Sequence, residues 1–480
     1  MSISGAFSNA LSGLNVASRA AELVSTNLAN ATTEGYAPRE LAQSSRGGQP
    51  GGGVSVDGIT RRVDRALVAD MRMADADAGQ ARSASSFLEA VETLVGPAGE
   101  AGGLASRLSA FETTLVSLAS RPDSATRLDR AANAATELVR GLNEASQGIQ
   151  DLRMRAERDI TTQVEMLNDD LARVAQLNAG IVASHRNDQG RAGLEDQRQN
   201  LIDRIAGVVP VRELPRENGA VALVTEGGAV LLDGRAARLS FNPANAIDAE
   251  MTAGNGALSG LQINGVNIPT DAEFGAVTGG TLGAAFRTRD ELAPQAQARL
   301  DAFAQDLIAR FETVSTPPGQ PGLFTDAGQP LGAAPRPGLA GRIAVHQGVD
   351  PAQGGATWRM RDGLDATAPG TAGDGSRVNA MIGALQSRRA APAAMSGAAA
   401  GTAADLAGEL VAGIGAARHR AESEESFAAA RQEGVKAQLL EQGVDTDAQM
   451  QRLLQIEQAY SANARLLQTL DEMMQTLMRL

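Results

Sequence analysis

The chain carries a heptad pattern of apolar residues near each of its two ends. In the first pattern the residues recur at spacings of four and three: Ile3, Phe7, Ala10, Leu14, Ala17, Ala21, Val24 and Leu28. The second pattern follows the same spacing: Leu453, Ile456, Tyr460, Asn463, Leu467, Leu470, Met474 and Leu477. A stripe of this kind stays exposed on a single helix unless a partner helix covers it. We therefore predict that the two terminal helices pair with each other as a coiled coil, or with neighbouring subunits.

Asn463 is the polar residue that interrupts the second stripe. An amide in a coiled-coil seam weakens the packing but penalises wrong registers, because it must find a hydrogen-bond partner. The alternative interpretation is an Asn tolerated at the surface of a slightly rotated helix. In both cases we expect residues 1–65 and 436–480 to form one inner module.

Long helical patterns follow the first terminal segment. Residues 83–94 and 104–119 have helical spacing, and residues 125–184 contain no Pro and little Gly. At about 1.5 Å per residue the last run would span roughly 90 Å. Asp123 is its expected N-cap. A helix of this length is typical of a rod-like bundle rather than of a globule.

The pattern changes at Val208 to short β-prone runs. Asn-Gly, Gly-Gly and Asp-Gly pairs separate these runs, and such pairs favour tight hairpin turns. The runs continue to about Gly280. They predict an inserted outer β domain over residues 208–281.

Helical spacing returns at Leu282, with a break expected at Pro294. Residues 315–375 are rich in Pro and Gly, and we expect loops and short strands there, packed on the helices. Residues 66–207 and 282–435 would then form the helical rod domain. The sequence thus predicts a mainly α, elongated, multidomain fold in which a bundle of long helices carries the β insertion.

Composition narrows the function classes. The chain has 43 Lys and Arg against 56 Asp and Glu, a net charge of -13, which disfavours nucleic acid and anionic membranes as partners. It has no Cys, which excludes disulfides and thiolate metal sites. We see no run near the roughly 20 apolar residues of a membrane span. The first residues also lack a cleaved secretion signal, so we expect any export to use another route.

Residues that usually carry catalysis are sparse. The sequence has no nucleophile elbow, Walker loop or Rossmann fingerprint. Three histidines are present without metal-ligand spacing: His185, His346 and His419. Asp445 and Asp447 lack the spacing of a calcium loop and suit turn and N-cap positions. We therefore expect no catalytic, cofactor-binding or metal site, and a protein that is not an enzyme.

The first heptad helix is followed by Asn27-Leu-Ala-Asn30-Ala-Thr-Thr33-Glu34-Gly35-Tyr36. This segment resembles the N-terminal motif of the flagellar axial proteins, a family of rod, hook and hook-associated members, usually Asn-x-x-Thr-x-Gly-Tyr. The matching positions are Asn30, Thr33, Gly35 and Tyr36. Gly35 can adopt the positive φ of a sharp turn after the helix. Glu34 stands where the family commonly has Pro.

The other end resembles the closing helix of the same family through Gln458-Ala-Tyr460-Ser-Ala-Asn463-Ala. Rod, hook and hook-associated members share these termini, so the middle of the chain distinguishes them. The segment around Asp196-Gln197-Arg198 resembles one in the hook-associated protein 1 family, as does Gly280–Glu291, and Gly373–Ala380 is a weaker match. The β insertion is short for that family.

This resemblance implies a structural protein of the extracellular bacterial flagellum, located at the hook-filament junction and needed for filament assembly and motility. It would be exported by the flagellar type III apparatus. Its implied partners are other copies of itself in a ring or helical lattice, the hook protein, a second junction protein next to the filament, and a cytoplasmic export chaperone on the C-terminal helix. The heptad residues would pack the subunits in the inner tube. The alternatives are another axial protein of the hook or distal rod, or a secreted coiled-coil effector or adhesin.

Overall fold

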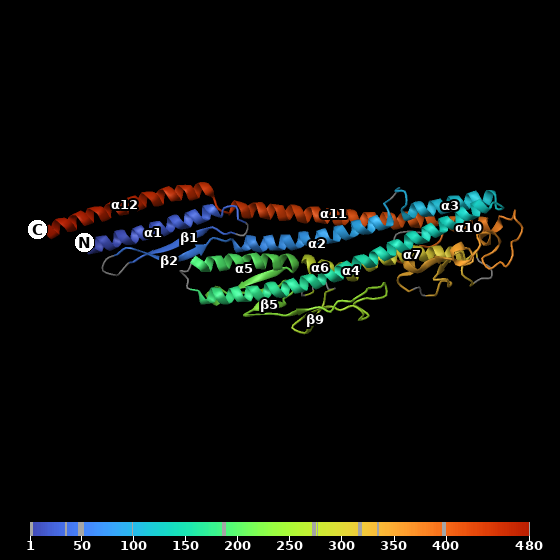
Figure 1. Cartoon of the computed structure of the whole chain (residues 1–480), viewed down its shortest axis with the longest axis horizontal. Coiled ribbons are helices and arrows are strands. Elements are labelled where there is room, and N and C mark those ends of the chain that lie inside the picture. Colours follow the sequence, from blue (N-terminus) through green and yellow to red (C-terminus); the bar gives the residue numbers. More distant parts are fainter. Residues whose placement is uncertain are drawn as a thin grey trace.

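The chain forms an elongated, mainly α-helical molecule with small β sheets along one flank (Figure 1). The computed structural model describes residues 3–33, 36–46, 52–97, 99–184, 189–270, 275, 277–314, 319–333, 336–395 and 400–479. The predicted fold class, long helices with an inserted β segment and paired terminal helices, is confirmed. Within the described residues no helix has the length and apolarity that a bilayer crossing requires.

The longer helices run along the long axis of the molecule. They are α1 (Ile3–Ala29), α2 (Arg65–Val95), α3 (Leu104–Ser120), α4 (Ala125–Ala183), α5 (Gln189–Val208), α6 (Gly280–Arg287), α7 (Ala293–Glu312), α10 (Ser376–Gln386), α11 (Ala403–Glu441) and α12 (Thr446–Arg479). The short ones are η1 (Glu217–Gly219), η2 (Thr288–Leu292), α8 (Leu339–Arg342), η3 (Pro351–Gln353) and α9 (Arg359–Asp362).

The strands are short and pair antiparallel. They are β1 (Arg39–Ser45), β2 (Val54–Arg61), β3 (Val211–Pro215), β4 (Val221–Thr225), β5 (Val230–Asp233), β6 (Arg235–Ala236), β7 (Leu239–Ser240), β8 (Leu261–Ile263), β9 (Val266–Ile268), β10 (Phe324–Asp326) and β11 (Ile343–Val345). In the predicted β insertion they form two sheets, ordered β3-β4-β5-β6 and β7-β8-β9. Asn218-Gly219 and Asn264-Gly265 adopt positive φ at hairpin turns, as an Asn-Gly pair favours.

Helix α4 has 59 residues and is the longest helix of the described chain. Its apolar residues recur every three or four positions, so one face is buried along its whole length. The helix begins after Ser124, whose side chain makes no capping hydrogen bond. Asp123 lies one residue earlier, in a turn closed by the Ser124 N–H on the Arg121 carbonyl. The prediction of Asp123 as the N-cap is therefore wrong.

Buried side chains gather in two core clusters at different levels along α4. One cluster joins α3, the first half of α4, α7, α10 and α11, and includes the mutually packed rings of Phe111, Phe311 and Phe324. The other joins the second half of α4 to α5, α6 and the inner faces of strands β3–β8. No described residue of α1 or α12 belongs to either cluster.

The predicted break at Pro294 is absent. Helices α6 and α7 are continuous through the π-helical turn η2, and Pro294 lies in the first turn of α7, directly after the π-helical turn. The π turn directs Arg289 into the molecule, with its side chain fully buried. Arg289 contacts Glu157 on α4 at 2.7 Å, Asp290 at 2.7 Å and the Ser259 carbonyl at 3.0 Å.

Two adjacent connections link the terminal helices to the rest of the molecule. Asp64 precedes α2 and its carboxylate accepts hydrogen bonds from the first turn of that helix. Asp445 caps α12 in the same way, in the turn that separates it from α11. The Gln442 amide nitrogen lies 3.4 Å from Asp64 Oδ2, so the two connections are side by side.

Candidate assembly site at the paired terminal helices

Helices α1 and α12 lie side by side and run antiparallel, so the two ends of the chain lie at the same end of the molecule (Figure 1). Two contacts fix their alignment. The Asn463 side chain lies over Gly13, and near the other end of the pair the Asn27 amide lies 3.4 Å from Gln449 Oε1. The two ends of the chain therefore form one structural unit, which we call the terminal pair.

The buried face of α1 combines small side chains with Leu23, which is 7% exposed. Ala10, Ala17 and Val24 are buried, and they belong to the predicted stripe. Between them the contacting position is one residue earlier than the stripe, at Gly13 and the buried Asn27. A Cβ atom on Gly13 would lie only 2.9 Å from the Asn463 side chain, so the glycine permits the close approach of the two helices.

The large side chains of the α1 stripe lie at the edge of this contact. Leu14 is half-buried, while Phe7 and Leu28 are 40% and 37% exposed. The backbone of Ile3 belongs to α1, but its side chain lies outside the described residues. These leucine and phenylalanine side chains leave apolar surface that a further chain could cover.

The α12 stripe faces α1 over most of its length. Leu453, Ile456, Asn463 and Leu467 are half-buried and Leu470 is buried, whereas Tyr460 and Met474 are exposed. The Leu477 side chain lies outside the described residues. Asn463 donates its amide to the Ala459 carbonyl on its own helix at 3.0 Å. Asn463 therefore aligns α12 with α1 by packing over Gly13 and not by donating a hydrogen bond to α1.

Asn27 is a polar centre that joins α1 to the segment that follows it. The residue is 1% exposed, and its Oδ1 atom accepts hydrogen bonds from the Tyr36 hydroxyl at 2.7 Å and the Arg39 N–H at 3.0 Å. Its amide nitrogen donates to the Arg39 carbonyl at 2.9 Å. Burial raises the pKa of Tyr36, which keeps the phenol protonated as a donor. The sequence placed Asn27 in the motif but did not predict this role.

Asn30 and Thr33 act locally at the end of α1. The Asn30 amide donates to the Thr26 carbonyl at 2.9 Å, and the Thr33 hydroxyl donates to Asn30 Oδ1 at 3.3 Å. The Thr26 carbonyl also accepts the Asn30 N–H at 3.1 Å, so Asn30 adds a second bond at the helix end and positions Thr33 beside it. Gly35 lies outside the described residues.

A β hairpin, which the sequence did not predict, connects the terminal pair to α5. Strands β1 and β2 bring Arg39 and Arg61 to the same carboxylate, Asp196, at 2.6 and 2.7 Å. All three side chains are mostly buried, so the contacts are stronger than those of surface ion pairs. The sequence around Arg39 and Arg61 does not indicate this contact, because Asp196 is far away in the chain.

The two residues after Asp196 point elsewhere. Gln197 is exposed, at a groove between α4 and α5. Arg198 is buried and donates to Asn178 Oδ1 at 2.9 Å and to the Gly219 carbonyl at 2.8 Å, and burial lowers its pKa. The predicted motif residues Asp196 and Arg198 thus hold α5 to the hairpin on one side and to α4 and the β insertion on the other.

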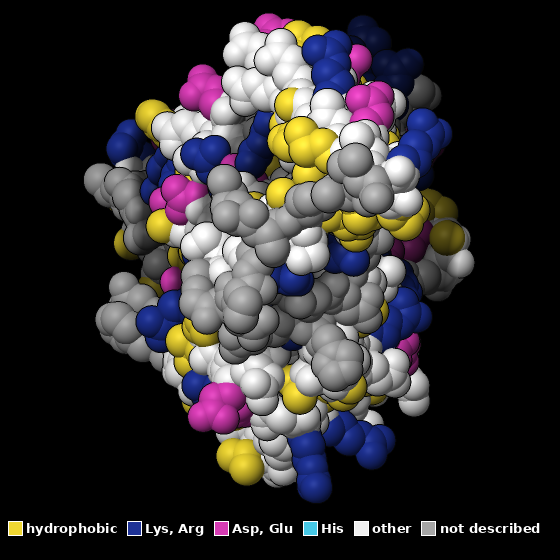
Figure 2. All heavy atoms as spheres, turned by 90° about the vertical axis from the view of Figure 1, so that its left-hand side faces the viewer, with side chains coloured by type: hydrophobic (Ala, Val, Ile, Leu, Met, Phe, Trp, Pro, Cys, Tyr) yellow, Lys and Arg dark blue, Asp and Glu magenta, His cyan; other side chains and the backbone are white. Residues whose placement is uncertain are grey.

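Apolar side chains are exposed on the terminal pair. Seen from the end where the two chain termini lie, the face shows hydrophobic side chains among Lys, Arg, Asp and Glu side chains (Figure 2). The exposed large residues of α12 are Met450, Leu454, Tyr460, Leu466, Met473, Met474 and Met478. A surface of this kind on a helix without a core of its own is suited to packing against other chains.

We predict that Gly13→Val destabilises the terminal pair by about 1–3 kcal/mol, because the new side chain overlaps with Asn463. Asn463→Ala should remove the overlap and recover most of the loss in the double variant. Faster amide hydrogen exchange in α12 would report the effect. Gly193→Val on α5 is the matched control, since a Cβ there meets nothing within 4 Å. Equal exchange in both single variants would contradict the prediction.

Comparison with known proteins gives matches at the middle and at the end of the chain. Residues 88–318 match the family model described as flagellar hook-associated protein FlgK helical domain. Residues 439–480 match that of the flagellar basal body rod FlgEFG protein C-terminal. The second match includes all of α12.

Several curated proteins are similar over more than half of the chain. It is 27% identical over 316 residues to flagellar hook-associated protein 1 of Salmonella typhimurium, covering 63% of this chain and 56% of the relative. The Escherichia coli protein of the same name is 24% identical over 333 residues, covering 65% and 58%. The matched part thus spans little more than half the length of these relatives. The hook junction protein FlgK from Burkholderia pseudomallei is a structural neighbour, with TM-score 0.45 and 19% identity over 54% of this chain and 47% of that one.

Proposed function

Because this chain belongs to the family of flagellar hook-associated protein 1, we propose that it is a structural component of the junction between hook and filament. It would be exported by the flagellar type III apparatus, act outside the cell, and be required for filament assembly and motility. We assign it a structural role and no catalytic one. The structural role is supported by a fold built of long helices.

The terminal pair is the observation that carries this proposal. Its helices approach closely at Gly13, none of their described residues belongs to the two core clusters, and large apolar side chains stay exposed. Such a pair gains its full burial when neighbouring chains pack against it. The heptad residues that we propose as subunit contacts include Phe7, Leu28 and Tyr460, which are exposed here.

We propose three regions with distinct places in the assembly. Residues 1–65 and 436–480 would form the inner module, residues 66–207 and 282–435 the helical rod domain, and residues 208–281 the outer β domain. The connections at Asp64 and Asp445 support the first boundary. The position of the β sheets on one flank of the helices supports the last (Figure 1).

The proposed partners are other copies of this chain in a ring or helical lattice, the hook protein and a second junction protein next to the filament. A cytoplasmic export chaperone would bind α12 before assembly. The exposed apolar face of that helix supports this partner, since amphipathic helices commonly dock in apolar grooves.

A strain that lacks the gene tests the proposed function. We expect electron microscopy to find hooks without filaments, and the culture medium to contain unassembled filament protein. A plasmid copy of the gene should restore filaments. Loss of the hooks would move the protein to the rod or hook, and normal flagella would overturn the proposal.

A further inference from the structure

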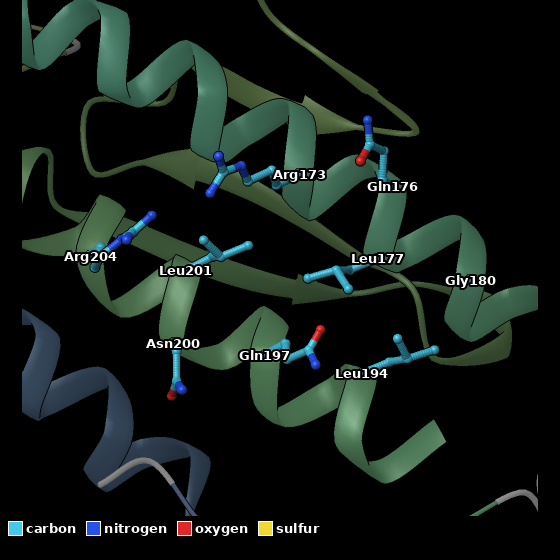
Figure 3. A pocket seen from close by; sticks show the side chains of 9 residues that line it. All are labelled: Arg173, Gln176, Leu177, Gly180, Leu194, Gln197, Asn200, Leu201 and Arg204. Carbon is cyan, nitrogen blue, oxygen red and sulfur yellow. The ribbon is translucent and has the colours of Figure 1, made fainter. Parts of the chain in front are cut away.

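The groove between α4 and α5 combines an apolar floor with an unpaired cation. The side chains of Leu177, Leu194 and Leu201 converge between the two helices (Figure 3). Arg173 lies at the rim, exposed, and has no ion pair or hydrogen bond with any other residue that the structure describes. Arg204, also at the rim, is already paired with Asp170. The groove is therefore suited to an apolar side chain accompanied by a carboxylate.

Helix α11 presents such a combination on another face of the molecule. Phe427 is 80% exposed, the largest exposure of any aromatic residue among the large hydrophobic residues of the described chain. Glu424 lies three residues earlier, on the same face of the helix, and is exposed. It has no ion pair within the described residues, whereas nearby Glu425 contacts Arg82 at 3.5 Å. We call Phe427 and Glu424 the α11 knob.

The knob and the groove of one molecule are separated by the rest of the helical body. Helix α11 packs along α2 at one edge, while α4 and α5 lie on the opposite side of α2 (Figure 1). One chain therefore cannot fill its own groove with its own knob. A second copy that lies alongside can fill it, and then presents its own groove or knob to a third copy.

From this complementarity we propose that the α11 knob of one copy docks in the α4–α5 groove of its neighbour. Phe427 would pack on Leu177, Leu194 and Leu201, and Glu424 would pair with Arg173. The contact joins two different surfaces, so it is heterologous and can continue around a ring or along a helix. This inference rests on the proposed function, and it names the lateral contact between copies in the assembly.

The fold also determines how such neighbours would be offset. Arg431 contacts Asp77 and Arg72 contacts Asp203, each at 2.7 Å, which places the knob and the groove at different levels along α2. Phe427 is two residues from Glu425, which contacts Arg82, whereas Leu194 and Leu201 precede Asp203 on α5. The two levels therefore differ by at least ten residues of α2, about 15–20 Å at 1.5 Å per residue. Copies with parallel long axes would therefore be staggered along the axis, which gives a helical arrangement rather than a flat ring.

Cysteine cross-linking in assembled flagella tests this contact, since the natural chain has no Cys. Ala430→Cys lies next to the knob, Gln197→Cys lies at the groove, and neither change removes the anchoring residues. With a short thiol cross-linker we expect a ladder of covalent oligomers from the double variant and only monomers from each single variant. Ala430→Cys with Thr162→Cys is the matched control, because Thr162 is exposed on α4 but does not line the groove.

Charge exchange tests the ion pair independently. Glu424→Arg and Arg173→Glu should each reduce the fraction of cells with filaments at least tenfold, and the double variant should recover it. Flagella that carry filaments yet give no ladder would overturn the docking contact and leave the proposed function intact. The contact would also be overturned if the double charge variant fails to recover filaments although it and the two single variants have normal helical content.

Discussion

Removal of residues 458–480 is expected to abolish incorporation of the protein into the flagellum and to leave cells without filaments. The truncation takes away the part of α12 that covers the first half of α1, including Asn463 over Gly13 and the buried Leu470. An isolated amphipathic helix such as α1 is then marginal in water. Electron microscopy of the complemented strain and detection of the protein in purified flagella measure the result.

The same truncation should leave the rest of the protein folded. Neither core cluster contains a described residue of α12, so the cores around α4 keep their packing. We expect near-normal resistance to proteolysis for residues 65–440. Val266→Ser, in the exposed turn region of the β insertion, is the control and should assemble normally. An assembled flagellum that contains the truncated protein would contradict the proposed role of the terminal pair.

Arg289→Met should lower the free energy of unfolding by about 3–5 kcal/mol. Arg289 is fully buried and neutralises Glu157, which is 1% exposed, and Asp290. Without the guanidinium these carboxylates lose their cation while they stay buried, and the Ser259 carbonyl loses its donor. The guanidinium also lies over the rings of Phe241 and Phe286, so the substitution removes favourable contacts with both rings.

Urea unfolding monitored by circular dichroism measures this loss of free energy of unfolding. If several unfolding transitions occur, the first one gives the value to compare. Arg287→Met is the matched control, since Arg287 belongs to α6 directly before the π turn and its pair with Glu291 is about half exposed. We expect the control to change stability by no more than about 0.5 kcal/mol. Equal losses in the two variants would show that the buried network around Arg289 is not what stabilises this region.

The elements that the sequence predicted are those in which one periodicity runs without interruption. Helix α4 begins and ends within a residue of its predicted bounds, because its buried face repeats every three or four residues between Pro122 and the segment after Ala183. The turns at Asn218-Gly219 were predicted because few residue pairs tolerate positive φ. Helical repetition and the turn preference of an Asn-Gly pair depend only on nearby residues, so both can be predicted from the sequence.

The contacts that depend on two distant segments were not predictable in the same way. Arg39 and Asp196 are 157 residues apart in the chain, and nothing in the spacing of either indicates the other. The contact of Gly13 with Asn463 was not predicted, because a rule based on apolar residues selects Leu14. A glycine contributes to such an interface by its missing side chain, which an apolar pattern cannot register.

The two adjacent connections at Asp64 and Gln442 also determine how force enters the molecule. A pull on the terminal pair is shared by the chain segment before α2 and the chain segment between α11 and α12. Neither segment therefore carries the whole tension. A sideways load instead tends to turn the pair about the level of these two connections. The ion pairs of Asp196 with Arg39 and Arg61 lie off that axis and resist the rotation. The junction between the terminal pair and the rest of the molecule is thus held by two covalent links against a pull and by these ion pairs against a sideways load.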